Sequence, residues 1–278
     1  MQNVSKNLLL QSLPENVSEL LGRHLRKALL PSQSVIYEPG DIPAEVYFPE
    51  TAAISLVVVF SNGTFAEAAM VGRDGMLGGF STLHDQRVAY RAVVQIKGEA
   101  LVINLDVLRR IARQHEAVMR MLLGHEHAML TQTQQIAACN ASHSLESRLC
   151  RWLLRASDAC GKRVLATTQE SIAEMLGVKR TSVSLMAHAL QEAGLVKNRR
   201  GHLELLNLSS LQERACECYS ATAKHYDYLT RTRGAKLEST KLETAVAPLG
   251  DVPSWGVLTA GTGLGNACFT NRKLDDKR

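Results

Sequence analysis

The residues best suited to chemistry in this 278-residue sequence lie between Thr167 and Leu205. Arg180 falls in the first turn of a predicted helix, and its guanidinium group matches the O6/N7 edge of guanine. Lys197, Arg199 and Arg200 follow at a predicted hairpin tip, where they would meet phosphates. Residues 141–215 carry 11 Lys and Arg against 7 Asp and Glu, whereas residues 1–140 carry 12 against 13. These features indicate recognition of nucleic acid.

Two helices and a hairpin would position these side chains. Thr167 and Glu170 have capping-box spacing, which predicts that a helix begins there, and Gly177 supplies a sharp turn before the next helix. The expected buried residues of the two helices are Ile172, Ala173, Leu176, Val183, Met186 and Leu190, with Val178 filling the corner. The alternating arms around residues 198–201 predict a wing. This pattern is typical of a winged helix-turn-helix.

The predicted DNA contacts lie on the faces that this packing leaves free. They are Thr168, Gln169, Lys179, Arg180, Thr181, Ser182, Ser184, Leu185 and His188 from the helices, and Lys197, Arg199 and Arg200 from the wing. The alternative is a helix pair with a solvated hairpin that binds protein.

The rest of the chain divides by pattern. Residues 20–105 have short apolar runs (residues 46–48, 53–60, 92–96 and 100–103) between turn signals, which predicts a sandwich, barrel or jelly roll. Residues 106–139 lack proline and predict one long helix, whose stripe (Met119, Leu122, Met129, Ile136) suits packing on its own domain or a dimer seam.

Two further segments follow from composition. Residues 144–159 predict an amphipathic helix with Leu145, Leu149, Trp152 and Leu153 inward and Arg148, Arg151 and Arg155 outward, ending at Gly161. Residues 231–278 lack hydrophobic periodicity and predict a disordered tail. No secretory signal or bilayer-length apolar segment is found, so the expected location is the cytoplasm.

Titratable clusters elsewhere suggest little chemistry. The Cys216-Glu217-Cys218-Tyr219 segment allows a redox switch or a metal clip with His225, but two thiols on one helix would point to different sides, so no metal is predicted. His125-Glu126-His127 is expected on a helix surface. Without a phosphate-binding loop, a zinc-protease motif or a nucleophile elbow, no enzyme is expected.

With these residues in view, the sequence resembles the Crp/Fnr family of bacterial transcription regulators over about residues 8–230. The resemblance rests on the motif from Thr168 to Val183 and on the Pro39-Gly40-Asp41 turn. It implies an α+β fold with a cyclic-nucleotide-binding-like jelly roll, or double-stranded β-helix (1–105), a long dimerisation helix (106–140) and a winged helix-turn-helix (141–230). It also implies a homodimer on a palindromic operator, with RNA polymerase as a further partner, and moves residues 106–139 to dimerisation.

The sequence departs from this family at the sites that bind its known signals. The cassette that holds a cyclic nucleotide carries Gly-Glu-Leu in the family, whereas residues 74–79 here contain no glutamate, and only Arg87 or Arg91 could hold a phosphate. Residues 1–138 contain no cysteine, which disfavours iron–sulfur and thiolate-ligated haem, and His84 is expected to be solvated. No cofactor is therefore predicted, and the effector stays open.

The recognition helix departs as well. Arg180 is retained, but Thr181 stands where many relatives have glutamate and Leu185 where they have a second arginine. The operator is therefore expected to differ from the usual half-site. A rival function is a signalling module that acts through protein contacts without sequence-specific DNA binding.

Overall fold

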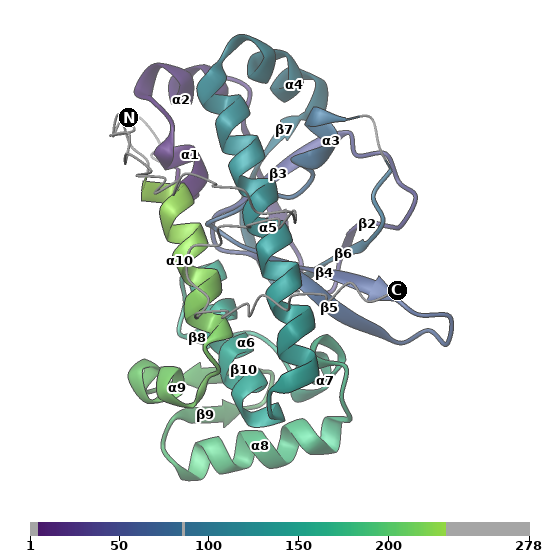
Figure 1. Ribbon diagram of the computed structural model, residues 1–278, viewed down its shortest axis with the longest axis vertical. Coiled ribbons are helices and arrows are strands. Elements are labelled where there is room, and N and C mark those ends of the chain that lie inside the picture. The colour runs from purple at the N-terminus through teal and green to yellow at the C-terminus, as the bar shows by residue number, and fades with distance from the viewer. Residues whose placement is uncertain (1–4, 85–86, 232–278) are drawn as a thin grey trace, which may run out of the picture. The chain divides into compact units, whose positions relative to one another are not determined.

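The chain forms two antiparallel sheets followed by a mainly helical half. The structure, a computed structural model, describes residues 5–84 and 87–231 (Figure 1). Its first part contains α1 (Leu8–Ser12), α2 (Glu15–Gly22), β1 (Arg26–Leu30), β2 (Val35–Tyr37), β3 (Glu45–Pro49), β4 (Ala53–Val59), β5 (Phe65–Val71), α3 (Phe80–Leu83), β6 (Arg91–Ile96) and β7 (Gly98–Asn104). Its second part contains α4 (Leu105–Gln114), α5 (Glu116–Ser142), α6 (Leu145–Cys160), β8 (Val164–Leu165), α7 (Gln169–Leu176), α8 (Arg180–Glu192), β9 (Val196–Arg199), β10 (His202–Leu205), α9 (Leu208–Arg214) and α10 (Cys218–Arg231).

The first seven strands make the predicted β-roll. One sheet has the order β1-β7-β3 and the other β2-β6-β4-β5, and neighbouring strands are antiparallel. The four apolar runs of the sequence coincide with β3, β4, β6 and β7. Gly40 (φ +97°) and Gly63 (φ +81°) take the left-handed conformation at two of the turns, which glycine adopts without a steric penalty. The jelly-roll prediction is confirmed.

The long helix expected over residues 106–139 is present as α5, but its predicted start is wrong, because the chain breaks at His115. His115 has an extended backbone (φ −128°, ψ 103°) and separates α4 from α5. Both helices bury apolar residues in one cluster that includes Leu108, Ile111, Val118 and Leu122. No glycine or proline marks this break in the sequence.

Helix α6 has the predicted bounds but not the predicted outer face. Ser144 caps its start, and Gly161 (φ +66°) ends it. Arg151 and Arg155, expected outward, are only 7% and 8% exposed. The helix lies between the β-roll and α10, so its polar side is covered as well as its apolar side. The two arginines therefore have structural roles that the amphipathic pattern hides.

The β-roll and the helix-turn-helix share one apolar core. Trp152 of α6 lies in the same cluster as Val57 and Met70 of the roll. The Glu67 carboxylate is buried at this junction, where Ser55 Oγ (2.5 Å) and Trp152 Nε1 (3.3 Å) donate to it. Burial raises the pKa of Glu67 to about 7, although the hydrogen bond from Ser55 and the charge of Arg151 oppose the shift.

This buried carboxylate predicts a pH-dependent stability. Its folded pKa lies above the ordinary 4.5, so the folded state binds more protons and the free energy of unfolding falls as pH rises from about 4.5 to about 7. Glu67 contributes about 3 kcal/mol at most to this change in the free energy of unfolding. Urea denaturation of Glu67→Gln should show a smaller loss of stability between pH 5 and pH 8 than the unsubstituted protein. An equal loss in both proteins would contradict this assignment.

The predicted tail, residues 231–278, lies outside the described residues apart from the last position of α10. In the part of the chain that the structure describes, no helix has the length and apolar character needed to span a bilayer.

Candidate DNA-binding surface

The helix-turn-helix begins one residue later than its capping pattern suggests. The side chain of Thr168, not Thr167, caps α7 by accepting from the Ser171 N–H (3.1 Å), whereas Thr167 is buried beside Gln95. Gly177 (φ +64°) then ends α7 in the left-handed conformation, as predicted. Thr168 is therefore the exposed residue at the start of the motif.

Helix α8 has one buried face and one free face. Val183, Ala187 and Leu190 are fully buried, whereas Met186, expected inward, is only half-buried. The opposite face exposes Lys179, Arg180, Thr181, Leu185 and His188. Leu185 is 64% exposed, so its apolar side chain is available for a contact on this face. In Figure 1, α8 lies at the end of the molecule away from the β-roll.

Four of the predicted contacts are less free. Ser184 Oγ donates to Oε1 of Gln169 (2.6 Å), so these two half-buried side chains join α7 to α8. Ser182 is also half-buried. Arg180 is paired loosely, with its Nε 3.4 Å from Glu170 Oε2 and both side chains more than half exposed. Exposed pairs of this kind contribute about 1 kcal/mol or less, so Arg180 can exchange Glu170 for another acceptor.

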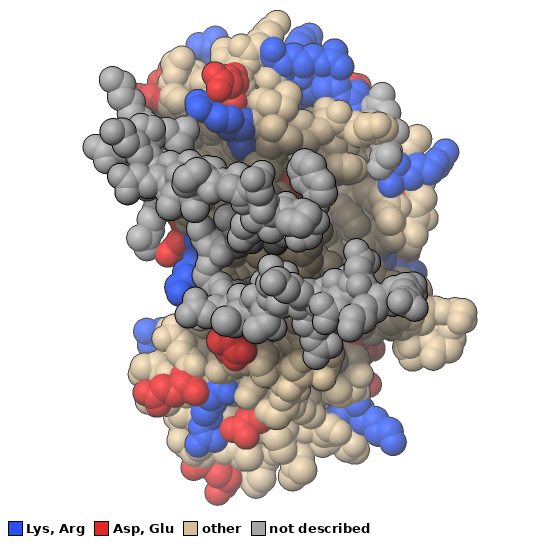
Figure 2. All heavy atoms as spheres, in the orientation of Figure 1, with Lys and Arg blue, Asp and Glu red and all other residues tan. Residues whose placement is uncertain are grey.

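The wing is the β9–β10 hairpin. Arg199 pairs with His202 in the register, and Gly201 (φ +75°) makes the turn. Lys197, Arg199 and Arg200 are exposed on or beside this hairpin. Figure 2 shows acidic and basic side chains interspersed over the helix-turn-helix half on the face in view, so no single-sign patch covers that face.

Helix α7 is tied to the β-roll by polar contacts. Ser171 Oγ accepts from Gln95 Nε2 (2.7 Å) and from Gln33 Nε2 (3.2 Å). These hydrogen bonds join α7 directly to the roll.

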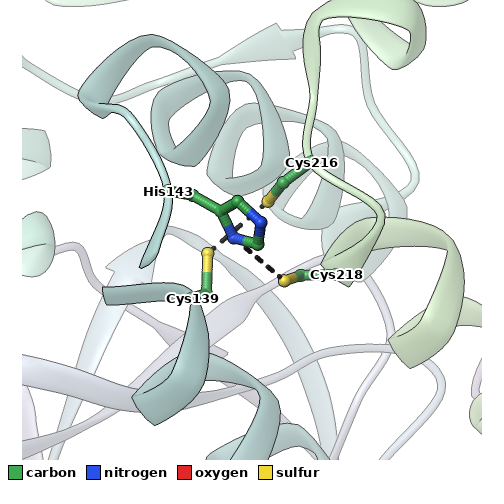
Figure 3. A group of neighbouring side chains, drawn as sticks. All are labelled: Cys139, His143, Cys216 and Cys218. Atoms are coloured by element: carbon green, nitrogen blue, oxygen red, sulfur yellow. Dashed lines mark hydrogen bonds between the residues drawn. The ribbon is translucent and has the colours of Figure 1, made fainter. Parts of the chain in front are cut away.

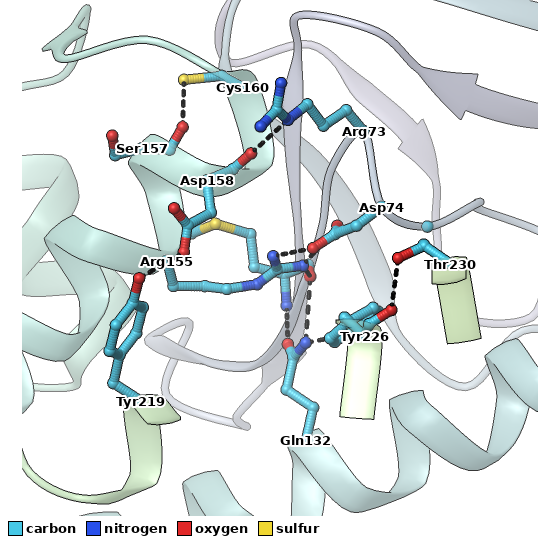
Figure 4. A network of polar contacts seen from close by, with 12 residues as sticks. Arg73, Asp74, Gln132, Arg155, Ser157, Asp158, Cys160, Tyr219, Tyr226 and Thr230 are labelled. Atoms are coloured by element: carbon cyan, nitrogen blue, oxygen red, sulfur yellow. Dashed lines mark hydrogen bonds and ion pairs between the residues drawn. The ribbon is translucent and has the colours of Figure 1, made fainter. Parts of the chain in front are cut away.

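A second connection runs through a buried ion pair. Arg155 of α6 makes a bidentate contact with Asp74, at 2.5 and 3.0 Å, and also donates to the Met70 carbonyl (Figure 4). Its guanidinium lies 4.7 Å from the centre of the Tyr226 ring. Burial is the largest single influence on the pKa of Arg155 and lowers it, but the charges of Asp74, Tyr226 and Asp158 and the hydrogen bond to Asp74 together raise the pKa above its ordinary value. This network borders a cavity of about 300 Å³ that Arg73, Asp158 and Tyr219 also line.

Residues 74–79, which stand where relatives carry the cyclic-nucleotide cassette, make hydrogen bonds to other parts of the same chain. Asp74 holds Arg155, and the Met76 N–H donates to Nε2 of His125 (3.1 Å). His125 is 1% exposed, so its predicted place on a helix surface is wrong: α5 turns that side chain into the roll. Arg87 donates to the Gly40 carbonyl and Arg91 pairs with Glu38 (2.8 Å), so both candidate phosphate ligands have protein partners.

A cysteine–histidine cluster is the feature that the sequence pattern missed. Cys216 lies in the loop before α10 and Cys218 begins that helix, so their sulfur atoms converge instead of pointing to different sides. They meet Cys139 and His143 from the end of α5, whereas His225, the expected third ligand, packs against His127. At least 73 positions separate Cys139 and His143 from Cys216 and Cys218 in the sequence, so no local pattern indicates the cluster.

Comparisons with known proteins agree with this architecture. Residues 28–115 match the cyclic nucleotide-binding domain, and residues 147–214 match the Crp-like helix-turn-helix domain. The global nitrogen regulator of Synechocystis is 24% identical over 189 residues, which cover 64% of this chain and 83% of that protein. FixK2 from Bradyrhizobium japonicum shares the fold with a TM-score of 0.59 at 16% identity, over 69% of this chain and 98% of that one.

A transcriptional regulator of the Crp/Fnr family from Thermus thermophilus has a TM-score of 0.52 at 21% identity, over 68% of this chain and 98% of that chain. The two matched domains stand in the order that the fold displays, with α5 between them. The chain therefore belongs to the Crp/Fnr family of transcription regulators.

Proposed function

We propose that this regulator binds a palindromic DNA operator as a homodimer, with α8 in the major groove and the β9–β10 wing on the backbone. The observation that carries the proposal is the free face of α8, where Arg180, Thr181, Leu185 and His188 lie together beside a basic hairpin. Arg180 in the first turn would read base edges. RNA polymerase as a partner and a cytoplasmic location stay predictions.

The experiment for this proposal separates backbone contacts from base readout. Arg199→Ala should weaken binding to all duplexes alike and reduce the slope of log affinity against log salt by about 1, because one phosphate contact is lost. Fluorescence anisotropy over a salt series measures this slope. Lys27→Ala, which removes an exposed charge from β1, is the matched control and should leave the slope unchanged. Salt-independent binding, or none, would favour the rival protein-interaction module.

The dimer seam that we propose differs from the stripe predicted from sequence. Leu122 and Ile136 of that stripe are buried within their own chain, at 0% and 6% exposure, so they stabilise the fold. Three exposed residues of α5 follow one another at seven-residue spacing: Leu123, Leu130 and Ala137. The two leucines are 54% and 56% exposed. Apolar residues seven apart on an open helix face suit a two-helix seam.

Charge on this seam should separate the protomers. Leu123→Glu with Leu130→Glu should give a monomer in sedimentation velocity and weaken binding to a palindromic duplex about 100-fold, because the linked half-sites no longer act together. Leu29→Glu, at a 76% exposed leucine on β1, is the control and should remain dimeric. A double variant that stays dimeric would remove this face of α5 from the seam.

We also propose that DNA binding does not depend on a cyclic nucleotide, an iron–sulfur cluster or haem. Support comes from the cassette-like loop, where Asp74 is paired with Arg155, and from Arg91, which is paired with Glu38. The described cysteines all lie at or beyond position 139, outside the β-roll.

A further inference from the structure

Four side chains that can bind a metal converge where the end of α5, the α5–α6 connection (residues 143–144) and the start of α10 meet (Figure 3). Cys139 lies in the last turn of α5 and His143 follows that helix, whereas Cys216 lies just before α10 and Cys218 is its first residue. Their sulfur and nitrogen ligand atoms all lie within 4.8 Å of one another. Sequence spacing does not bring them together; the packing of α10 along α5 does.

The distances within the cluster match a tetrahedral zinc site. Sγ of Cys139 is 3.5 Å from Sγ of Cys216, and Sγ of Cys218 is 3.5 Å from Nδ1 of His143. Zinc–sulfur bonds of about 2.3 Å and zinc–nitrogen bonds of about 2.05 Å give tetrahedral edges of about 3.8 Å for S···S and about 3.6 Å for S···N. A small adjustment of the side chains would therefore place four donors around one ion.

The outer contacts orient these donors. Nε2 of His143 lies 3.2 Å from Oε1 of Glu217, which leaves Nδ1 facing the sulfurs. A histidine ligand commonly donates its other N–H to a carboxylate in this way. Gln135 Nε2 donates to Cys218 Sγ (3.0 Å), as an outer partner of a thiolate would.

Charge around the cluster is also suited to a metal thiolate. Three thiolates with one Zn²⁺ carry a net charge of −1. Arg148 and Arg151 of α6 lie close enough for their charges to act on Cys139. The three thiols are at most 7% exposed, so the site is closed, as structural zinc sites are.

We infer that one Zn²⁺ is bound by Cys139, His143, Cys216 and Cys218. The ion fastens the start of α10 to the α5–α6 connection. Binding releases the thiol protons and leaves His143 neutral. A Cys139–Cys216 disulfide is the rival use of the same atoms. It would need neither the ring of His143, nor Cys218, nor the carboxylate of Glu217, and the arrangement of those three groups favours the metal.

Cobalt substitution tests the site in the full-length reduced protein. One equivalent of Co²⁺ should produce sulfur-to-cobalt charge-transfer and intense tetrahedral d–d absorption, and Zn²⁺ should displace it. Cys216→Ser and His143→Ala should lose or shift these bands, and Glu217→Gln should weaken Zn²⁺ competition about 10-fold. Cys160→Ser, at a buried cysteine outside the cluster, is the matched control and should keep them.

Two further measurements keep the inference falsifiable if a variant folds poorly. Zn²⁺ should raise the Tm of the unsubstituted protein and of Cys160→Ser, but not that of Cys216→Ser. Absence of tetrahedral absorption in the unsubstituted protein, or its retention in Cys216→Ser, would overturn the inference. So would a Cys139–Cys216 disulfide, seen by peptide mass mapping, in protein prepared under reducing conditions.

Discussion

Arg155→Ala should destabilise the protein by about 3–5 kcal/mol. The change leaves the Asp74 carboxylate, whose side chain is 10% exposed, without its bidentate partner. It also removes the donor to the Met70 carbonyl and the cation over the Tyr226 ring. A buried charge that loses its bidentate counter-charge carries a large cost of desolvation. Urea denaturation followed by circular dichroism measures the loss.

Two companion variants distinguish this cost from loss of packing. Asp74→Leu combined with Arg155→Met removes both charges, and its stability should lie much closer to that of the unsubstituted protein. Arg26→Ala breaks the exposed pair with Glu45 and should cost about 1 kcal/mol or less. An Arg155→Ala protein within 1 kcal/mol of the unsubstituted one would show that the pair does not hold the two domains together.

Arg180→Ala should cost about 1–3 kcal/mol of specific DNA binding, which is about 5- to 150-fold in affinity, and should relax base preference at one position. Its guanidinium is 66% exposed at the start of α8 and packs into no core, so the fold should be unaffected. Competitive gel-shift titration with specific and random duplexes measures both effects.

Glu170→Ala is the matched control, because it breaks the same ion pair from the other side. If Arg180 acts by reading bases, Glu170→Ala should bind as tightly as the unsubstituted protein. Equal losses in the two variants would mean that the pair only shapes the motif, and unchanged affinity in Arg180→Ala would remove it from the readout.

Local signals predicted the elements of the recognition motif. Gly177 ends α7, Gly161 ends α6 and the alternating arms of the wing are β9 and β10, because each depends on backbone preference over a few residues. The β-roll followed for the same reason, from turn residues between short apolar runs.

Long-range packing accounts for what the sequence did not predict. Arg151 and Arg155 have the spacing of an exposed helix face, yet α10 and the roll cover them. The break at His115 has no turn residue, and the cysteine cluster joins positions that lie more than 70 residues apart. Such features depend on which elements meet, and periodicity within one element carries no record of its neighbours.

The central claim is that this protein reads a palindrome with paired α8 helices, and selection from a random duplex pool without added effector tests it most directly. Footprinting of the enriched duplexes should reveal an inverted repeat whose half-sites are centred about 10 base pairs apart, or a multiple of that spacing, because a two-fold dimer presents its recognition helices one helical turn apart. Retention of duplex without enrichment of any inverted repeat, or no retention at low salt, would contradict the account.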